Sequence, residues 1–263
     1  MTTTEFSTTY GPYAVVTGAS SGIGEAFSGL LAKRGLNLFL VARRGDRLAR
    51  LADTLQHDCG VQVQTLAADL VKASEVQRVV EASADLDVGL LVSNAGFSLK
   101  GAFSSVDANN MINMLMVNCQ APLLLAHGFI PHLKARGKGG LIFTSSVEAL
   151  IGCPYSTAYS ASKALVKSLG EGLWGELTPS GIDVLTLCPG ATDTEALANS
   201  GADASAMPNV MSAAAVAELA LDNIKNGPVF VSSEHYRRLF EQLVAMPRDQ
   251  ALATMAAQLQ RHL

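Results

Sequence analysis

The chain has 263 residues, of which 49% are hydrophobic, and a formal net charge of −4 from 19 basic and 23 acidic side chains. This length and apolar content favour one domain over residues 1–263 with a substantial core. The scattered lysines and arginines exclude the basic patch expected of a protein that binds nucleic acid or an anionic membrane.

Three features bear on location. The first eleven residues lack the basic and apolar regions of a signal peptide, so a frayed polar tail is expected there. The most apolar long run, residues 111–130, is interrupted by Asn113, Asn118, Gln120 and Pro122, which favours a buried helix over a membrane span. The four cysteines form neither a CxxC pair nor a zinc-like spacing with histidine, so we expect reduced thiols and a soluble, cytoplasmic protein.

Short apolar runs alternate with longer amphipathic stretches along the chain. Strands are expected at residues 13–17, 37–42, 61–67, 89–94, 140–146, 182–188 and 229–232. Helices are expected to begin near Ile23, Arg44, Val71, Ser105, Thr157 and Ser212. This alternation predicts a doubly wound α/β domain of about seven parallel strands with helices on both faces.

Three glycines, Gly18, Gly22 and Gly24, stand where the first strand is expected to end and the first helix to begin. A backbone without Cβ lets a pyrophosphate approach the free N–H groups and the positive dipole of a helix N-terminus. The spacing favours a loop that holds a dinucleotide phosphate. It is GxxxGxG, however, and differs from the common GxGxxG fingerprint and from a P-loop, so a glycine turn that binds nothing is the alternative.

Tyr159 and Lys163 lie four residues apart on an expected helix, so their side chains share a face. A phenol with a pKa of about 10 is a poor acid or base near neutrality unless a neighbouring cation favours the phenolate, and Lys163 could supply that cation. Ser146, thirteen residues before Tyr159, could donate a hydrogen bond to a carbonyl oxygen as charge develops on it. The three residues indicate acid–base chemistry at a carbonyl group.

These motifs resemble, in order and spacing, those of the short-chain dehydrogenase/reductase family. They are TGASSGIG at 17–24, ADL at 68–70, NAG at 94–96, Asn118 in MVNCQAP, Ser146, YSASK at 159–163 and PGATDT at 189–194. The resemblance covers nearly the whole chain up to about Pro189. It implies a strand order of 3-2-1-4-5-6-7, a cofactor across the carboxyl edge of the sheet, and hydride transfer between a nicotinamide and an alcohol or ketone carbon.

The resemblance also implies catalytic roles. Tyr159 corresponds to the general acid/base and Ser146 to the group that polarises the carbonyl, with the neighbouring Ser145 as the alternative. Lys163 would hold the nicotinamide ribose hydroxyls and assist Tyr159. Asn118 would fix a water in the proton relay, and its alternative role is that of a satisfied polar residue in a buried helix.

Further residues correspond to the family's cofactor contacts. Those implied at the diphosphate are Gly18, Ser20, Ser21, Gly22, Ile23 and Gly24; at the adenosine, Asp69, Leu70, Asn94, Ala95 and Gly96; at the nicotinamide side, Tyr159, Lys163, Pro189, Gly190, Thr192 and Thr194. Asp69 has an alternative role as a helix cap.

The choice of cofactor depends on Ala42, Arg43 and Arg44, which follow the second expected strand. A carboxylate at this point usually binds the ribose 2′-OH of the unphosphorylated dinucleotide, whereas an arginine accommodates a 2′-phosphate. Arg43 offers a planar bidentate donor, so we expect NADP(H). The alternative is that Arg43 and Arg44 only solvate the start of the next helix.

The substrate walls are expected from Phe97, from residues 148–155, and from a lid at about 191–211. The named candidates are Glu148, Tyr155, Leu197, Met207 and Met211. Because most of these are apolar, a hydrophobic substrate is favoured, such as a 3-oxoacyl, steroid-like or aromatic ketone or the matching secondary alcohol. Glu148 replaces a small residue common in the family, and it would either meet a polar substrate group or pair locally. His127 and His132 do not share a helical face, so no metal is expected.

Two other function classes remain open. A nucleotide-sugar epimerase or dehydratase shares the Tyr-x-x-x-Lys pair, but it resembles GxxGxxG at the first turn and has a larger C-terminal domain than the 73 residues after Gly190. A non-catalytic NADP sensor would usually lack a catalytic residue. The apolar helices expected over 105–136 and 157–178 pair across a two-fold axis in the family, so a homodimer or homotetramer is expected.

Overall fold

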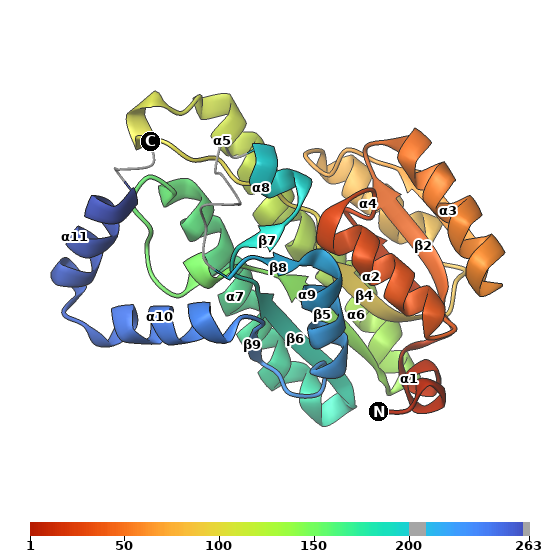
Figure 1. The fold of residues 1–263 in the computed structure, drawn as a ribbon. Helices are drawn as coiled ribbons and strands as arrows, with labels where there is room; N and C mark the ends of the chain where they lie inside the picture. The colour runs from red at the N-terminus through yellow and green to blue at the C-terminus, as the bar shows by residue number, and fades with distance from the viewer. Residues whose placement is uncertain (200–208, 260–263) are drawn as a thin grey trace.

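A computed structural model describes residues 1–199 and 209–259 (Figure 1). In this part of the chain the central sheet has seven parallel strands in the order β3-β2-β1-β4-β5-β6-β9. They are β1 (Tyr13–Thr17), β2 (Asn37–Ala42), β3 (Val63–Ala67), β4 (Val88–Ser93), β5 (Gly139–Thr144), β6 (Ile182–Cys188) and β9 (Val229–Val231). The predicted fold class and strand order are confirmed. A separate pair, β7 (Thr192–Asp193) and β8 (Met211–Ser212), lies outside this sheet.

The strands form where apolar runs are covered on both faces. Every residue of β4 and β5 is buried, which is the pattern of inner strands in a parallel sheet. The edge strand β3 has only half-buried and exposed positions, and it begins two residues later than expected. Strand β5 ends at Thr144, so Ser146 lies just beyond the strand at the carboxyl edge of the sheet.

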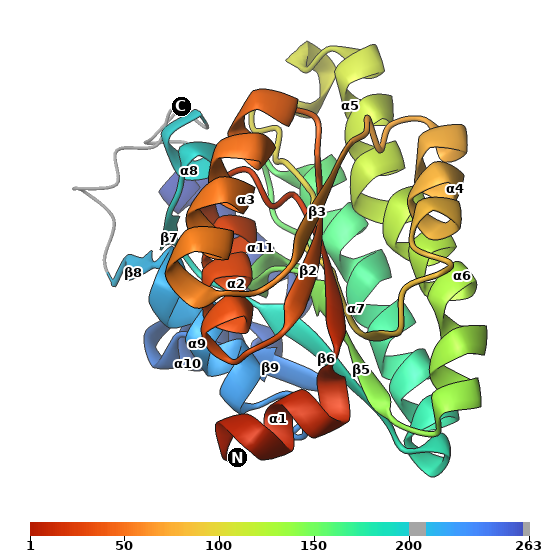
Figure 2. The ribbon, with the colours of Figure 1, turned by 90° about the vertical axis from the view of Figure 1, so that its right-hand side faces the viewer.

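Helices cover both faces of the sheet, as Figure 2 shows. One face carries α2 (Gly22–Lys33), α3 (Gly45–Cys59) and α9 (Ala213–Asp222), whose buried side chains form one hydrophobic core with the strands. The other carries α4 (Ala73–Ala82), α6 (Ala121–Arg136) and α7 (Thr157–Leu177), which form a second core.

Residues 105–136 do not form one continuous α-helix. Helix α5 (Ala108–Leu115) passes into a π-helical turn, Met116–Gln120, before α6 begins. Such a turn inserts a residue into the helix and is frequent at functional sites. Among the described residues, the stretch Ala108–Arg136 is also the one helix apolar and long enough to cross a membrane, but it packs here against α4, α7, β4 and β5.

The expected frayed tail at the N-terminus is wrong. Residues Thr3–Tyr10 form helix α1, which begins with a capping box between Thr2 and Glu5. Phe6 and Tyr10, four residues apart, are buried, and the Tyr10 hydroxyl donates a hydrogen bond to Asp183 Oδ2 at 2.6 Å. These two aromatic side chains anchor a segment whose other residues are mostly polar.

Two C-terminal helices were not anticipated from the sequence. Helices α10 (Glu234–Ala245) and α11 (Arg248–Leu259) lie beside the sheet's carboxyl edge, at the left of Figure 1. Their buried side chains pack with Val147, Ile151 and Cys153 in a third hydrophobic cluster, separate from the two main cores. They therefore form a wall next to the segment that carries Ser146.

Candidate active site

A cleft of about 920 Å³ lies at the carboxyl edge of the sheet. This is where open α/β sheets bind ligands, because the loops after the strands diverge there. Of the residues that the sequence singled out for catalysis or cofactor binding, all except Gly24 and Asn118 line the cleft. A Cβ on Gly24 would lie 2.2 Å from the Gly18 oxygen, so Gly24 supports the loop by packing closely against its backbone. Gly24 does not line the cleft.

The glycine loop has the geometry of an anion cradle. Gly18 and Gly22 have φ angles of +68° and +58°, a conformation that side chains disfavour. Helix α2 begins at Gly22, and the preceding Ser21 makes no side-chain cap. The first N–H groups of α2 therefore remain available to an anion, and the loop fits the diphosphate of a dinucleotide.

Ser146, Tyr159 and Lys163 meet at the same end of the cleft. The Ser146 hydroxyl accepts a hydrogen bond from the Glu148 N–H at 3.2 Å and is also hydrogen-bonded to Tyr159. The Lys163 ammonium is buried, donates to the Thr144 carbonyl at 2.9 Å, and lies 5.7 Å from the centre of the Tyr159 ring. The alternative Ser145 hydroxyl donates instead to the Lys163 backbone oxygen at 2.7 Å, so it braces helix α7.

Electrostatics favour a protonated phenol and a charged ammonium at neutral pH. Burial, assisted by the negative charge of Glu148, raises the pKa of Tyr159 above its ordinary value, and the hydrogen bond with Ser146 lowers it in part. Burial lowers the pKa of Lys163 to about 8. Burial thus outweighs the expected help from the Lys163 cation, and Tyr159 is held in the form that donates a proton.

Asn118 does not reach the cleft. Its side chain lies in the π-helical turn, where Oδ1 accepts from the Phe97 N–H at 3.1 Å and Nδ2 donates to the Phe97 oxygen at 3.0 Å and to Ser162 Oγ at 3.1 Å. A Cβ on Gly96 would lie 2.9 Å from Asn118 Oδ1 and 3.2 Å from Lys163 Nζ. The amide therefore fixes the segment after Gly96 beside Lys163, and the role of Asn118 in a proton relay stays a prediction.

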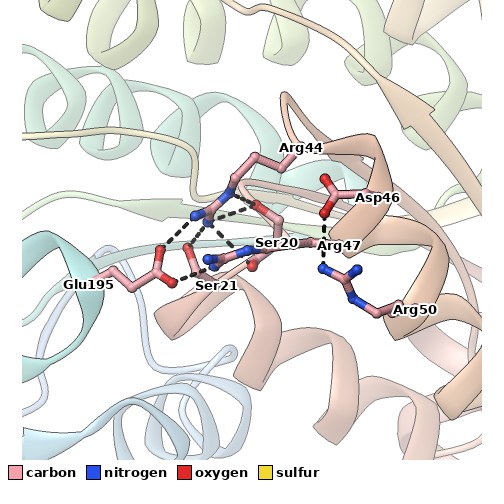
Figure 3. Close-up of polar contacts among 7 residues, drawn as sticks. All are labelled: Ser20, Ser21, Arg44, Asp46, Arg47, Arg50 and Glu195. Atoms are coloured by element: carbon pink, nitrogen blue, oxygen red, sulfur yellow. Dashed lines mark hydrogen bonds and ion pairs between the residues drawn. The ribbon is translucent and has the colours of Figure 1, made fainter.

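The two arginines after β2 have different surroundings. Arg43 is exposed, lines the cleft, and makes no hydrogen bond or ion pair with residues 1–199 or 209–259. The Arg44 guanidinium donates to Ser20 Oγ at 3.1 Å, to Ser21 Oγ at 2.7 Å and to Glu195 Oε2 at 2.8 Å (Figure 3). Arg43 is thus available to an anionic ligand, whereas Arg44 is held by protein atoms.

At the adenosine end, Asp69 serves two purposes. Its side chain lines the cleft, and its Oδ1 also accepts a hydrogen bond from the Val71 N–H at 3.3 Å. The local turn and a cofactor contact are therefore compatible at this residue.

The substrate end of the cleft is mostly apolar. Phe97, Tyr155 and Leu197 line it as expected, whereas Met211 packs against the core on the α2 side and Met207 lies outside the described residues. The sequence reasoning missed the wall from α10 and α11, which is formed by Tyr236, Leu239, Phe240, Leu243 and Met255. A sequence signal for this wall exists, because residues 236, 239, 240 and 243 have the spacing of one helix face.

Glu148 pairs locally, which was one of its two expected roles. Its Oε1 lies 3.3 Å from Lys100 Nζ, and both side chains line the cleft. Its Oε2 is buried without a hydrogen-bond partner among the described residues. The pair places one negative and one positive charge beside the catalytic group in otherwise apolar surroundings.

Comparison with known proteins agrees with this geometry. The model of the short chain dehydrogenase family matches residues 12–205. The chain belongs to this family. As a short-chain dehydrogenase it is an oxidoreductase, and the dehydrogenase interpretation replaces the sensor and epimerase alternatives.

Individual relatives of this short-chain dehydrogenase align with most of its chain. It is 30% identical over 251 residues to 7beta-hydroxysteroid dehydrogenase from Clostridium sardiniense, covering 95% of this chain and 96% of that protein. A short-chain dehydrogenase from Sphingobium yanoikuyae in complex with NADPH has a TM-score of 0.82 and 33% identity, covering 92% of this chain and 95% of that one. A family member from Burkholderia phymatum in complex with NAD has a TM-score of 0.77 and 25% identity, covering 88% and 92%.

Proposed function

We propose that the chain is an NADP(H)-dependent enzyme that interconverts a bulky hydrophobic ketone and its secondary alcohol. The observation that carries the proposal is the meeting of Ser146, Tyr159 and Lys163 with apolar walls in one cleft, next to an uncapped glycine loop. A nicotinamide cofactor bound there supplies or accepts the hydride. The chain's own residues handle the proton and the orientation of the substrate.

In the direction of reduction, Tyr159 donates its phenolic proton to the carbonyl oxygen as negative charge develops on that atom. The Ser146 hydroxyl donates a hydrogen bond to the same oxygen and fixes its position. Lys163, held by the Thr144 carbonyl, keeps a positive charge near the phenol and stabilises the phenolate that proton transfer leaves. In oxidation the phenolate takes the proton back from the alcohol.

The preference for NADP(H) rests on Arg43. Its guanidinium is exposed at the cleft without a protein partner in the described ranges, and no carboxylate precedes it at position 42. The Sphingobium relative with NADPH supports this preference, and the Burkholderia relative with NAD shows that the family alone does not decide it.

The substrate class rests on the wall from α10 and α11. Leu239, Phe240, Leu243 and Met255 present apolar side chains to the cleft, which suits a large apolar skeleton better than a sugar. The similarity to a hydroxysteroid dehydrogenase supports the same class. The test is a panel of steroid-like, 3-oxoacyl and aromatic ketones and alcohols with each cofactor, followed by the absorbance of the reduced nicotinamide. Turnover of sugars but of none of these compounds would contradict the proposal.

The pair of Glu148 and Lys100 leads to a prediction on pH dependence. Because the charge of Glu148 raises the pKa of Tyr159, Glu148→Gln is expected to lower that pKa. Reduction requires protonated Tyr159. As pH rises, kcat/KM for the ketone should therefore start to decrease at a lower pH in this variant than in the parent. Lys100→Met leaves Glu148 without its cation and should shift the fall to higher pH. Equal shifts in one direction, or none, would contradict this account.

Exposed apolar side chains lead to a prediction on assembly. Ile112, Leu123, Leu165 and Trp174 are between 37% and 54% exposed on α5, α6 and α7. We propose that these helices pair in a homodimer or homotetramer. Light scattering at micromolar concentration should therefore give two or four times the chain mass of 27.5 kDa. A monomer under these conditions would overturn the proposal.

We also propose a cytoplasmic location. The support is that Cys59, Cys119, Cys153 and Cys188 are all free thiols, as is usual in a reducing compartment.

A further inference from the structure

A network of charged side chains joins three segments that are far apart in the sequence (Figure 3). Glu195 is the first residue of α8 (Glu195–Asn199) and is separated from β7 by Thr194 alone. Its Oε2 accepts from Arg44 at 2.8 Å, and its Oε1 accepts from Arg47. Arg44 in turn donates to Ser21 Oγ at 2.7 Å in the glycine loop. One carboxylate thus connects the segment after β6 to the start of α3 and, through Arg44, to the loop after β1.

This network lines the cleft beside the glycine loop, where a diphosphate would lie. Ser20, Ser21, Arg44 and Glu195 all line the cleft. In the strand order, β1 stands between the β2–β3 side, which carries Arg43 and Asp69, and the β5–β6 side, which carries Tyr159. An extended dinucleotide that reaches both sides must therefore pass the glycine loop, next to this connection.

A second close contact lies beside the ionic one. A Cβ on Gly22 would lie 3.0 Å from the Thr194 methyl group, so the residue before Glu195 is packed directly on the glycine loop. Thr194 thus packs directly on the glycine loop, and Glu195 is joined by two ion pairs to Arg44 and Arg47 at the start of α3.

We propose that Glu195 is a positioning residue that latches the β7–α8 segment over the cofactor's diphosphate through Arg44 and Arg47, and thereby sets the rate of cofactor exchange. The inference rests on the proposed function, because it requires a dinucleotide in this cleft. Hydrogen bonds from Arg47 and Arg44 lower the pKa of Glu195 to about 2, so the latch stays charged at neutral pH. Since all three side chains are about 40% exposed, the latch should weaken with added salt.

The test is the rate constant of NADPH release from the full chain. Enzyme loaded with NADPH is mixed rapidly with excess NADP⁺, and the loss of bound-nucleotide fluorescence is followed. Glu195→Gln keeps the shape and removes the charge, so NADPH should leave roughly three to ten times faster at low salt, the size expected of a small network of exposed ion pairs. Arg47→Gln should have a smaller effect of the same sign, and the double variant should resemble Glu195→Gln alone.

Asp46→Asn is the matched control. Asp46 pairs with Arg50 at 2.9 Å on the same helix α3, but this pair does not reach α8 (Figure 3). The control keeps both ion pairs of Glu195, so it should change the release rate and its salt dependence far less than Glu195→Gln does. Glu195→Gln should remove much of the acceleration that salt causes. The melting temperature of the cofactor-free enzyme should change no more in Glu195→Gln than in the control.

Release from Glu195→Gln at the parental rate, or equal acceleration in Asp46→Asn, would overturn the latch. NADPH would still bind in a saturable way in that case, so the proposed function would stand. If the parent enzyme shows no saturable NADPH binding at all, the proposed function and the latch both fail.

Discussion

Tyr159→Phe should lower kcat for ketone reduction by a factor of about 10²–10⁴, the range that acid–base groups contribute. Phenylalanine keeps the ring that packs above Lys163 but removes the hydroxyl bonded to Ser146 and offers no proton to the substrate oxygen. The affinity for NADPH should change little, because the ring and Lys163 remain. Steady-state kinetics with a ketone identified in the panel, together with a fluorescence titration of NADPH, separate the two effects.

Tyr155→Phe provides the matched control for this experiment. Tyr155 lines the same cleft and lies four residues earlier, but it has no lysine four residues after it. Removal of the Tyr155 hydroxyl in this control variant should alter KM more than kcat. A folded Tyr159→Phe variant that retains parental turnover would refute the assignment of the acid.

Arg43→Ala should weaken NADP(H) binding about 10- to 100-fold while the affinity for NAD(H) stays nearly constant. The expected loss is about 1.5–3 kcal/mol, the range for a hydrogen bond to a charged group, and it applies only to a ligand that carries the 2′-phosphate. Both cofactors are titrated against parent and variant at one salt concentration, because phosphate contacts are screened by ions.

Two further variants make the cofactor experiment decisive. Ala42→Asp places a carboxylate at the end of β2, where it should repel the 2′-phosphate and help reverse the preference. Arg50→Ala removes an arginine of α3 that does not line the cleft, and it should leave both affinities unchanged. Tighter binding of NAD(H) by the parent, or equal weakening of both cofactors in Arg43→Ala, would mean that Arg43 only solvates the start of α3.

The sequence predicted the sheet and the polar centre of the site well because both depend on local patterns. The strands 13–17, 37–42 and 182–188 are short, mostly apolar runs, and the structure has the same limits for them. Gly18 and Gly22 have positive φ angles, which follows from the tight turn that the sequence indicated.

The features that were missed depend on contacts between distant segments. Helix α1 forms around Phe6 and Tyr10 only because the base of the sheet offers them a partner such as Asp183. Arg44 is held by protein atoms because it pairs with Glu195, which lies about 150 residues away in the chain, whereas Arg43 has no such partner in the described part of the chain. No local sequence pattern connects Glu195 to either arginine. The wall from α10 has a visible apolar stripe, but its position over the cleft follows from tertiary packing alone.

The third hydrophobic cluster has a consequence for how this enzyme could diversify. Helices α10 and α11 pack on Val147 and Ile151 and not on the two cores that hold the sheet together. The ring of Tyr236 lies 2.2 Å from the position where a Cβ on Gly190 would stand, so α10 is also fitted closely to the segment after β6. Substitutions in this third cluster can reshape the substrate wall while the two main cores that hold the sheet stay intact. A library of variants at Leu239, Phe240, Leu243 and Met255 is therefore expected to yield new ketone specificities with few substitutions.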